Sequence, residues 1–271
     1  MAVIVEPRTI EKWEHLSELV SQFAGKGWIF RGVHRERDQI KVIKGMPPTK
    51  VRGRSYSLIP SIGRPNNTQQ IGGGERKLKT KDEKALLQLF KREARTRFEY
   101  TPDADADLEW LVLGQHHRLY TRLLDWSESV LVAAFFAVES PPIAGAIYGV
   151  KAPLDLRLDA DPFKYLPSPR LVRPPHINPR ITAQKGVLTL HPNPTQAWED
   201  SVIHCWEISR TPVHSLEIKR KLAFAGIHEA SLFPDSADRH TAYLSWRHKW
   251  DDLPTFSRSN SRKKAPRAGA G

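Results

Sequence analysis

The stretch that decides the fold is GQHHRLYTRLLDWSESVLVAAFFA, which runs from Gly114 to Ala137. Its first half brings together Gln115, His116, Arg122 and Asp125, and its second half is almost wholly apolar. Polar groups avoid apolar surroundings unless they are hydrogen-bonded or ion-paired. The stretch therefore contains either a buried structural pairing or the floor of a functional site, and both interpretations are open at this point.

Hydrophobic periodicity on both sides of this stretch predicts the secondary structure. Apolar residues three to four positions apart predict helices, and the apolar run that begins near Ser127 or Ser129 predicts a helix buried on most sides. Helices cluster early in the chain and strands late, so we expect an α+β fold, a single domain whose N-terminal helical part packs on a mostly antiparallel β-sheet. Helices are predicted around residues 10–20, 81–98, 108–117, 127–139, 218–226 and 237–246, and strands around 27–33, 146–151, 185–190, 202–208 and 213–218.

Two segments of the chain are basic and rich in turn residues. The first is residues 34–81, a long basic loop after the first core strand, with sequences such as IGGGERK. The second is residues 251–271, a basic tail without apolar periodicity that we expect to be disordered. We therefore expect one domain over residues 1–250, with the 34–81 loop as an insertion in it, followed by the tail.

The formal charge of +12 and the isoelectric point near 9.9 favour an anionic partner. Nucleic acid is the first candidate and a membrane surface the second, while the plainer alternative is a soluble protein with a basic tail. The longest apolar run, residues 130–138, is too short to span a bilayer, and the first residues do not have the pattern of a signal peptide. We therefore expect a cytoplasmic protein without a transmembrane segment; its oligomeric state is left open.

Arg122 and Asp125 allow two interpretations. As a structural pair, they would form a buried ion pair that fixes a turn before the apolar helix, because buried charges persist mainly when they are paired. As functional residues, Arg122 would face a pocket and recognise a phosphate or carboxylate, with Asp125 orienting it. Of the two residues, we expect Asp125 to anchor the turn and Arg122 to face the pocket.

Several other residue types could carry chemistry. His116 could act as a general acid or base, because imidazole titrates near neutral pH, whereas His117 is expected on the surface. Arg31 interrupts an apolar strand. It could be an arginine of an edge strand that points into solvent, or it could face a ligand phosphate, with Gly32 allowing close backbone approach. Cys205 is the sole cysteine, and the two adjacent histidines point to different helix faces, so we expect no metal site.

The chain resembles the FRG domain family, which takes its name from the tripeptide at residues 30–32. The resemblance rests mainly on the QHHRLYTRLLDW block and the apolar helix after it. It extends to residues 178–192, through Arg180, Gln184 and Gly186, and to AFAGIHEASLFPDSAD, where Asp235 matches. Arg118 and Tyr120 stand where the family usually has glycine and proline.

The resemblance implies a bacterial protein with a toxin or defence-linked function, and it loosely suggests an NAD pocket like that of ADP-ribosyltransferases. In such a pocket Arg31, Gln115, Arg122 and Gln184 would bind the cofactor. Catalysis would use His116 together with a carboxylate, since cleaving a glycosidic bond needs one nearby. The expected carboxylate is Glu109, with Glu207 as the alternative. These two acids and Glu229 have unusual settings in the sequence, and each could instead be a surface or ion-paired acid.

Three functions remain open on the sequence alone. The first is an NAD-using transferase or glycohydrolase that acts as a toxin or phage-defence effector. The second is a non-catalytic module that binds nucleic acid through the basic loop and tail. The third is a small-ligand sensor. The enzyme hypothesis predicts that the pocket residues converge around one cavity: Arg31, Gln115, His116, Arg122, Asp125 and Gln184.

Overall fold

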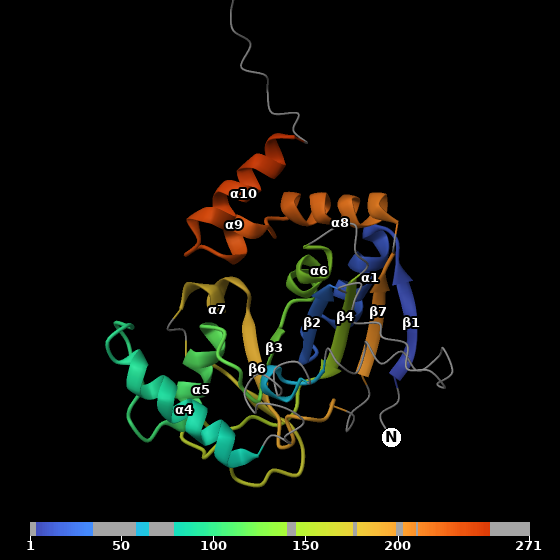
Figure 1. Cartoon of the computed structure of the whole chain (residues 1–271). Coiled ribbons are helices and arrows are strands. Elements are labelled where there is room, and N and C mark those ends of the chain that lie inside the picture. Colours follow the sequence, from blue (N-terminus) through green and yellow to red (C-terminus); the bar gives the residue numbers. More distant parts are fainter. Residues whose placement is uncertain are drawn as a thin grey trace, which may run out of the picture.

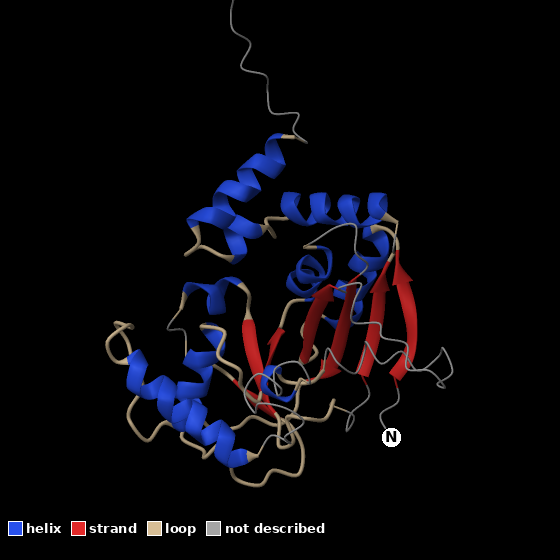
Figure 2. Cartoon of the chain, in the orientation of Figure 1, coloured by secondary structure: helices blue, strands red, loops and turns tan. Residues whose placement is uncertain are grey.

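A seven-stranded mixed sheet forms the centre of the fold (Figures 1 and 2). The computed structural model describes residues 4–34, 58–64, 79–139, 145–175, 178–198, 203–209 and 211–249. The strand order is β1-β7-β4-β2-β3-β6-β5, in which β1 and β7 run parallel and the other neighbours are antiparallel. The strands are β1 (Ile4–Ile10), β2 (Trp28–His34), β3 (Leu123–Ser127), β4 (Gly145–Lys151), β5 (Arg170–Val172), β6 (Gly186–Leu190) and β7 (Ile203–Ile208).

The helices pack around this sheet and complete the expected single-domain α+β fold. Ser129 caps the buried apolar helix α6, because its hydroxyl accepts a hydrogen bond from the Val132 amide, as the sequence predicts. The helices are α1 (Trp13–Phe23), α4 (Thr80–Ala94), α5 (Asp107–His116), α6 (Val130–Val138), α7 (Pro179–Ala183), α8 (Pro212–Phe224), α9 (Glu229–Leu232) and α10 (Ala237–His248), with a short 3₁₀ helix η2 (Ser61–Gly63).

The glycine of the FRG tripeptide lets α6 lie directly on the sheet. A Cβ atom added to Gly32 would lie 1.7 Å from the carbonyl oxygen of Ala133, so no other residue fits beneath the helix. Gly145 on the neighbouring strand β4 faces Ala137 of α6 in the same way, at 2.0 Å. The close backbone approach expected at Gly32 is therefore confirmed, but the group that approaches is the α6 backbone and not the expected ligand.

Helical cover on this face of the sheet divides into two groups. Helices α1, α6 and α8 pack over β1, β7, β4 and β2, and α4 and α5 pack over β3, β6 and β5 (Figure 1). Side chains alternate along a strand, and the register of β3 places Asp125 on the same face as Leu123 and Ser127. Asp125 therefore lies between the two helical groups.

The sheet also opens between β2 and β3 at this point. The two strands pair at Phe30 and Ser127, and no further pairing joins them in the described residues. Beyond that pair the guanidinium of Arg31 bridges the gap, because its Nη1 donates to the backbone carbonyl of Asp125 at 2.7 Å. A side-chain hydrogen bond thus takes the place of the next backbone hydrogen bond between β2 and β3.

Two predictions of secondary structure were wrong. Residues 213–218, predicted as a strand, belong to α8, which starts with Pro212 at its first turn and buries Ser215, Ile218 and Leu222. The segment of Leu123 to Ser127, predicted as a turn, is the strand β3. Of the predicted basic loop, residues 35–57 and 65–78 lie outside the described residues, as does the whole tail, residues 251–271.

Candidate functional site

Two adjoining cavities lie where α5, α7, β3 and β6 meet. The smaller, of about 80 Å³, is referred to below as the Arg180 cavity; the larger, of about 210 Å³, is the aromatic cavity. Both are lined by Val112, His116 and Ile181. The Arg180 cavity is completed by Gln115, Asp125, Trp126, Pro174, Arg180, Gln184, Gly186, Val187 and Leu188, and the aromatic cavity by Phe98, Glu99, Tyr100, Leu113, His117 and Asn178.

A chain of hydrogen bonds fixes the carboxylate at the Arg180 cavity. Gln115 donates from Nε2 to Asp125 Oδ2 at 2.7 Å, and its Oε1 accepts from the hydroxyl of Thr121. Arg31 Nη1 lies 3.9 Å from the same Oδ2. The Asp125 side chain nevertheless remains 62% exposed, so it is oriented by its partners and still accessible from the cavity.

Arg31 itself is largely buried beside this carboxylate. Burial lowers the pKa of its guanidinium to about 10, with Arg64 adding repulsion and Asp125 opposing the shift. The group remains charged at neutral pH. It is absent from the lining of both described cavities, so its contact with them runs through Asp125.

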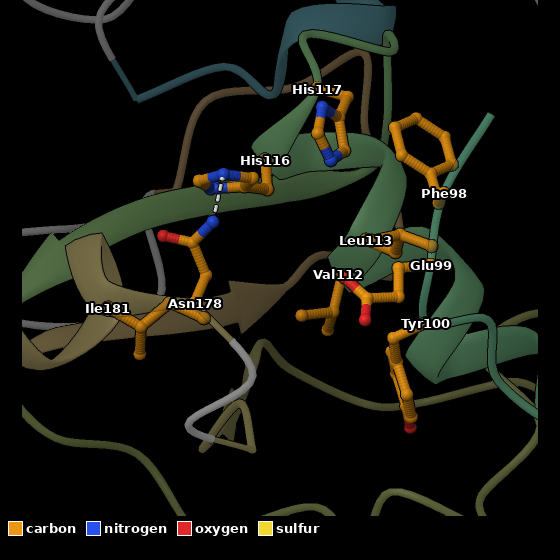
Figure 3. Close-up of a pocket in the computed structure, with 9 residues that line it drawn as sticks. All are labelled: Phe98, Glu99, Tyr100, Val112, Leu113, His116, His117, Asn178 and Ile181. Carbon is orange, nitrogen blue, oxygen red and sulfur yellow. Dashed lines mark hydrogen bonds between the residues drawn. The ribbon is translucent and has the colours of Figure 1, made fainter. Parts of the chain in front are cut away.

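Asn178 determines the tautomer of His116 (Figure 3). The Asn178 side chain caps α7, because its Oδ1 accepts from the Arg180 amide at 2.7 Å. This bond identifies which atom of the Asn178 amide is the oxygen. The other atom, Nδ2, lies 2.7 Å from His116 Nε2 and must donate a hydrogen bond to that nitrogen. His116 Nε2 is then the acceptor and the ring proton is on Nδ1.

Neutral His116 is favoured by its surroundings. Burial lowers its pKa, and the neighbouring His117 and Arg180 lower it further. In this state His116 offers the cavity an N–H donor. Acting as a base would require it to give up the hydrogen bond from Asn178, so the geometry favours a ligand-orienting role over the general-base role predicted from sequence.

The C-terminal helices hold the other side of the Arg180 cavity. Arg180 Nε donates to Asp235 Oδ1 at 2.6 Å, and its guanidinium lies over the ring of Phe233, 5.4 Å from the centroid. Burial is the largest single effect on Asp235 and opposes its ionisation, but the hydrogen bond and charge of Arg180, together with a backbone hydrogen bond, lower the pKa. Gln184 Nε2 donates to the carbonyl of Leu232 at 2.9 Å, which ties α7 to α9.

Arg122 lies in a buried ion pair away from both cavities, and its partner is Glu83 on α4. Its Nε and Nη2 donate to the two carboxylate oxygens of Glu83, each at 2.8 Å, and Nη1 donates to the carbonyl of Pro162 at 3.2 Å. The predicted Arg122–Asp125 pair was wrong, because positions three apart in an extended chain point to opposite faces. The two expected roles are therefore exchanged: Arg122 forms the buried structural ion pair, and Asp125 lines the cavity.

The three carboxylates with unusual settings in the sequence lie apart from the cavities. Glu109 accepts a hydrogen bond from the hydroxyl of Tyr100 at 3.4 Å and so holds a ring of the aromatic cavity without lining it. Glu207 lies on β7 beside β1 and β4. Glu229 pairs with Lys219 at 2.8 Å. The carboxylates that do line the cavities are Asp125 and Glu99.

Sequence reasoning brought four of its six pocket residues to one cavity and missed three others. Gln115, His116, Asp125 and Gln184 converge there, whereas Arg31 touches it only through Asp125, and Arg122 does not touch it. Three residues were not predicted at the pocket: Arg180, which lines this cavity, Asn178, which lines the aromatic cavity, and Asp235, which lines neither but holds Arg180. Arg180 and Asp235 were noted only as part of the resemblance. The sequence Asn178-Pro179 is a helix-start signal that could have located the cap, but the contact with His116 is a tertiary one.

The described residues contain neither a cluster of metal ligands nor a helix that could span a membrane. Within those ranges, no group of three or more His, Cys, Asp or Glu residues is placed to hold a metal ion. Among the described helices, none has the length and apolar character needed to cross a bilayer.

Comparison with known proteins identifies the domain. The family model of the FRG domain matches residues 51–144, a range that includes α4, α5, β3 and α6. The tripeptide on β2 and the resembling segments after β4 lie outside the matched residues. No curated protein and no solved structure matches this chain. The chain is therefore an FRG domain-containing protein.

Proposed function

We propose that this protein binds a small anionic ligand of the nucleotide class, with NAD as the first candidate, in the Arg180 cavity. The observation that carries the proposal is the guanidinium of Arg180. Its Nε is bonded to Asp235, but within the described residues its two terminal Nη groups have no hydrogen-bond partner. A planar pair of N–H donors at a cavity wall fits two oxygens of a phosphate group.

The other polar groups of the cavity supply orientation and charge balance. His116 offers Nδ1–H as a second donor, and Gln184 lines the wall beside α9. Within each of the pairs Arg31–Asp125 and Arg180–Asp235, the two charges neutralise each other. The ligand phosphate would therefore compete with Asp235 for the charge of Arg180 and would not meet an excess of positive charge.

With NAD as ligand, we propose Asp125 as the catalytic carboxylate, because it lines the cavity and its side chain is accessible. In the proposed hydrolysis the Asp125 carboxylate takes a proton from water as the water oxygen bonds to ribose C1′. The C1′–N bond breaks, its electron pair leaves with the nicotinamide, and the nicotinamide departs neutral. The products are ADP-ribose, nicotinamide and a proton. Consuming NAD in this way is the activity that we propose for a toxin or defence-type role.

A thermal-shift titration combined with chromatography of the NAD reaction tests the proposal. At a ligand concentration 100 times Kd, binding stabilises the folded state by about 2.7 kcal/mol. At roughly 2–4 °C per kcal/mol for a domain of this size, that is a rise of about 5–11 °C in Tm. We expect this rise with ADP-ribose and slow release of nicotinamide from NAD.

Two matched variants separate ligand binding from stability. Arg180→Gln removes the donors and should abolish the ligand-dependent shift. Asp235→Asn breaks the same ion pair but keeps Arg180, so it should retain or enlarge the shift. Equal shifts in the wild type and in Arg180→Gln would contradict the proposal. Asp125→Asn should bind ADP-ribose and lose nicotinamide release; unchanged release would remove Asp125 from the reaction.

A further inference from the structure

The aromatic cavity next to Arg180, called the slot below, has aromatic rings on one side and an aliphatic side chain on the other. Phe98, Tyr100 and His117 form one side, and Ile181 of α7 lies on the other (Figure 3). The rings of Phe98 and His117 are in contact with each other, with centroids 4.2 Å apart and an angle of 33° between their planes. A planar heterocycle between an aromatic and an aliphatic wall gains contact area on both faces. The cavity of about 210 Å³ is large enough for one base but not for a whole dinucleotide.

The polar groups of the slot favour a ring that donates hydrogen bonds. Glu99 lines the slot, and Figure 3 shows its carboxylate between Val112 and Tyr100, facing the open centre. An ionised carboxylate can only accept hydrogen bonds. The Tyr100 hydroxyl is directed to Glu109, so the hydroxyl is engaged and the ring is held in place.

The slot and the Arg180 cavity share a wall. Val112, His116 and Ile181 line both, so a ligand can place a ring in one and a phosphate in the other. Resting on the proposed function of the Arg180 cavity, we propose that the slot binds an amino-bearing purine base, with Glu99 accepting from its exocyclic amino group. Glu99 is then the residue that determines base specificity, and an adenine nucleotide is the ligand class.

Three ligands of the full-length protein separate the two proposals: ribose 5-phosphate, AMP, and purine riboside 5′-monophosphate, which is AMP without the amino group. Calorimetric titration should show that both purine nucleotides bind more tightly than ribose 5-phosphate. AMP should bind roughly tenfold more tightly than the nucleotide without the amino group, because the lost hydrogen bond is to a charged acceptor.

Variants assign the effect to the slot. Glu99→Ala should remove the preference for AMP and leave ribose 5-phosphate unchanged, whereas Glu93→Ala, an exposed glutamate at the end of α4, should change neither. Tyr100→Ala should bring both purine nucleotides close to ribose 5-phosphate. If ribose 5-phosphate binds through Arg180 and the purine nucleotides bind no more tightly, the base slot is refuted while the proposed function stands. If none of the three ligands binds, both the base slot and the proposed function are refuted.

Discussion

The buried pair of Arg122 and Glu83 yields the most quantitative prediction. The side chains are only 4% and 5% exposed and are joined by two parallel charge-assisted hydrogen bonds. Replacing Glu83 by Gln keeps the shape but leaves the arginine charge buried without its counter-ion. Breaking a buried pair from one side costs about 3–5 kcal/mol. For a domain of this size the expected fall in Tm is about 6–20 °C.

The double variant Glu83→Leu/Arg122→Met distinguishes a structural role from a ligand-binding one. Replacing both partners by apolar side chains removes the desolvation cost, so this variant should recover most of the stability lost in Glu83→Gln. It should also bind ADP-ribose like the wild type, because neither residue lines the cavities. Chemical denaturation and calorimetry measure the two properties.

An exposed pair provides the control. Arg157 and Asp159 are hydrogen-bonded in similar geometry but are 86% and 66% exposed, so Asp159→Asn should leave Tm unchanged within error. The reasoning is refuted if Glu83→Gln is no more destabilising than this control. A folded double variant that no longer binds ADP-ribose would instead return Arg122 to the ligand-binding role.

Three further predictions concern the backbone and a buried histidine. Arg118 has φ +66°, a conformation that strains every residue except glycine. Arg118→Gly should therefore be about 1 kcal/mol more stable than Arg118→Ala, which loses the same charge but keeps the backbone strain. Equal Tm values for the two variants would exclude the strain. Gly32→Ala should prevent α6 from seating and abolish cooperative unfolding, whereas Gly186→Ala, whose nearest contact would be 3.5 Å, should be tolerated; a stable Gly32→Ala protein would contradict the packing. Burial and the charges of Arg31 and Arg122 lower the pKa of His191 from its ordinary 6.5 to about 3. The contribution of neutral His191 to the free energy of unfolding is therefore complete above pH 6.5. It is lost as the pH falls from 6.5 towards 3, at about 1.4 kcal/mol per pH unit. Urea unfolding at pH 7 and pH 5 should therefore show a smaller pH effect in His191→Gln than in the wild type, and the same effect in both would disprove the assignment.

Local patterns were enough to predict most of the elements. Helices α4, α5 and α6 have clear periodicity or apolar content over at least nine residues, and the cap at Ser129 is a local signal. The α8 error has a tertiary cause. The alternation in residues 213–218 resembles a strand, but packing against α6 buries positions 215, 218 and 222, which have helical spacing.

The partners of the polar residues could not be predicted in the same way. Arg122 and Glu83 are 39 positions apart, and Arg31 and Asp125 are 94 apart, so no spacing within the signature block reveals either pair. The block identified Gln115, His116 and Asp125 as exceptional. Their arrangement around a cavity depends on α7, which brings Asn178 and Arg180 from another part of the chain.

The central claim is that a ligand phosphate binds Arg180 beside a neutral His116 whose proton is on Nδ1. The most direct test is a ¹⁵N-resolved NMR spectrum of the histidine rings at pH 7, recorded during a titration with ADP-ribose. We expect His116 to be the Nδ1–H tautomer, with ring signals that shift saturably in the wild type and in Asp235→Asn and do not shift in Arg180→Gln. An unchanged His116 signal in the wild type at saturating ADP-ribose would contradict binding of the ligand phosphate at Arg180.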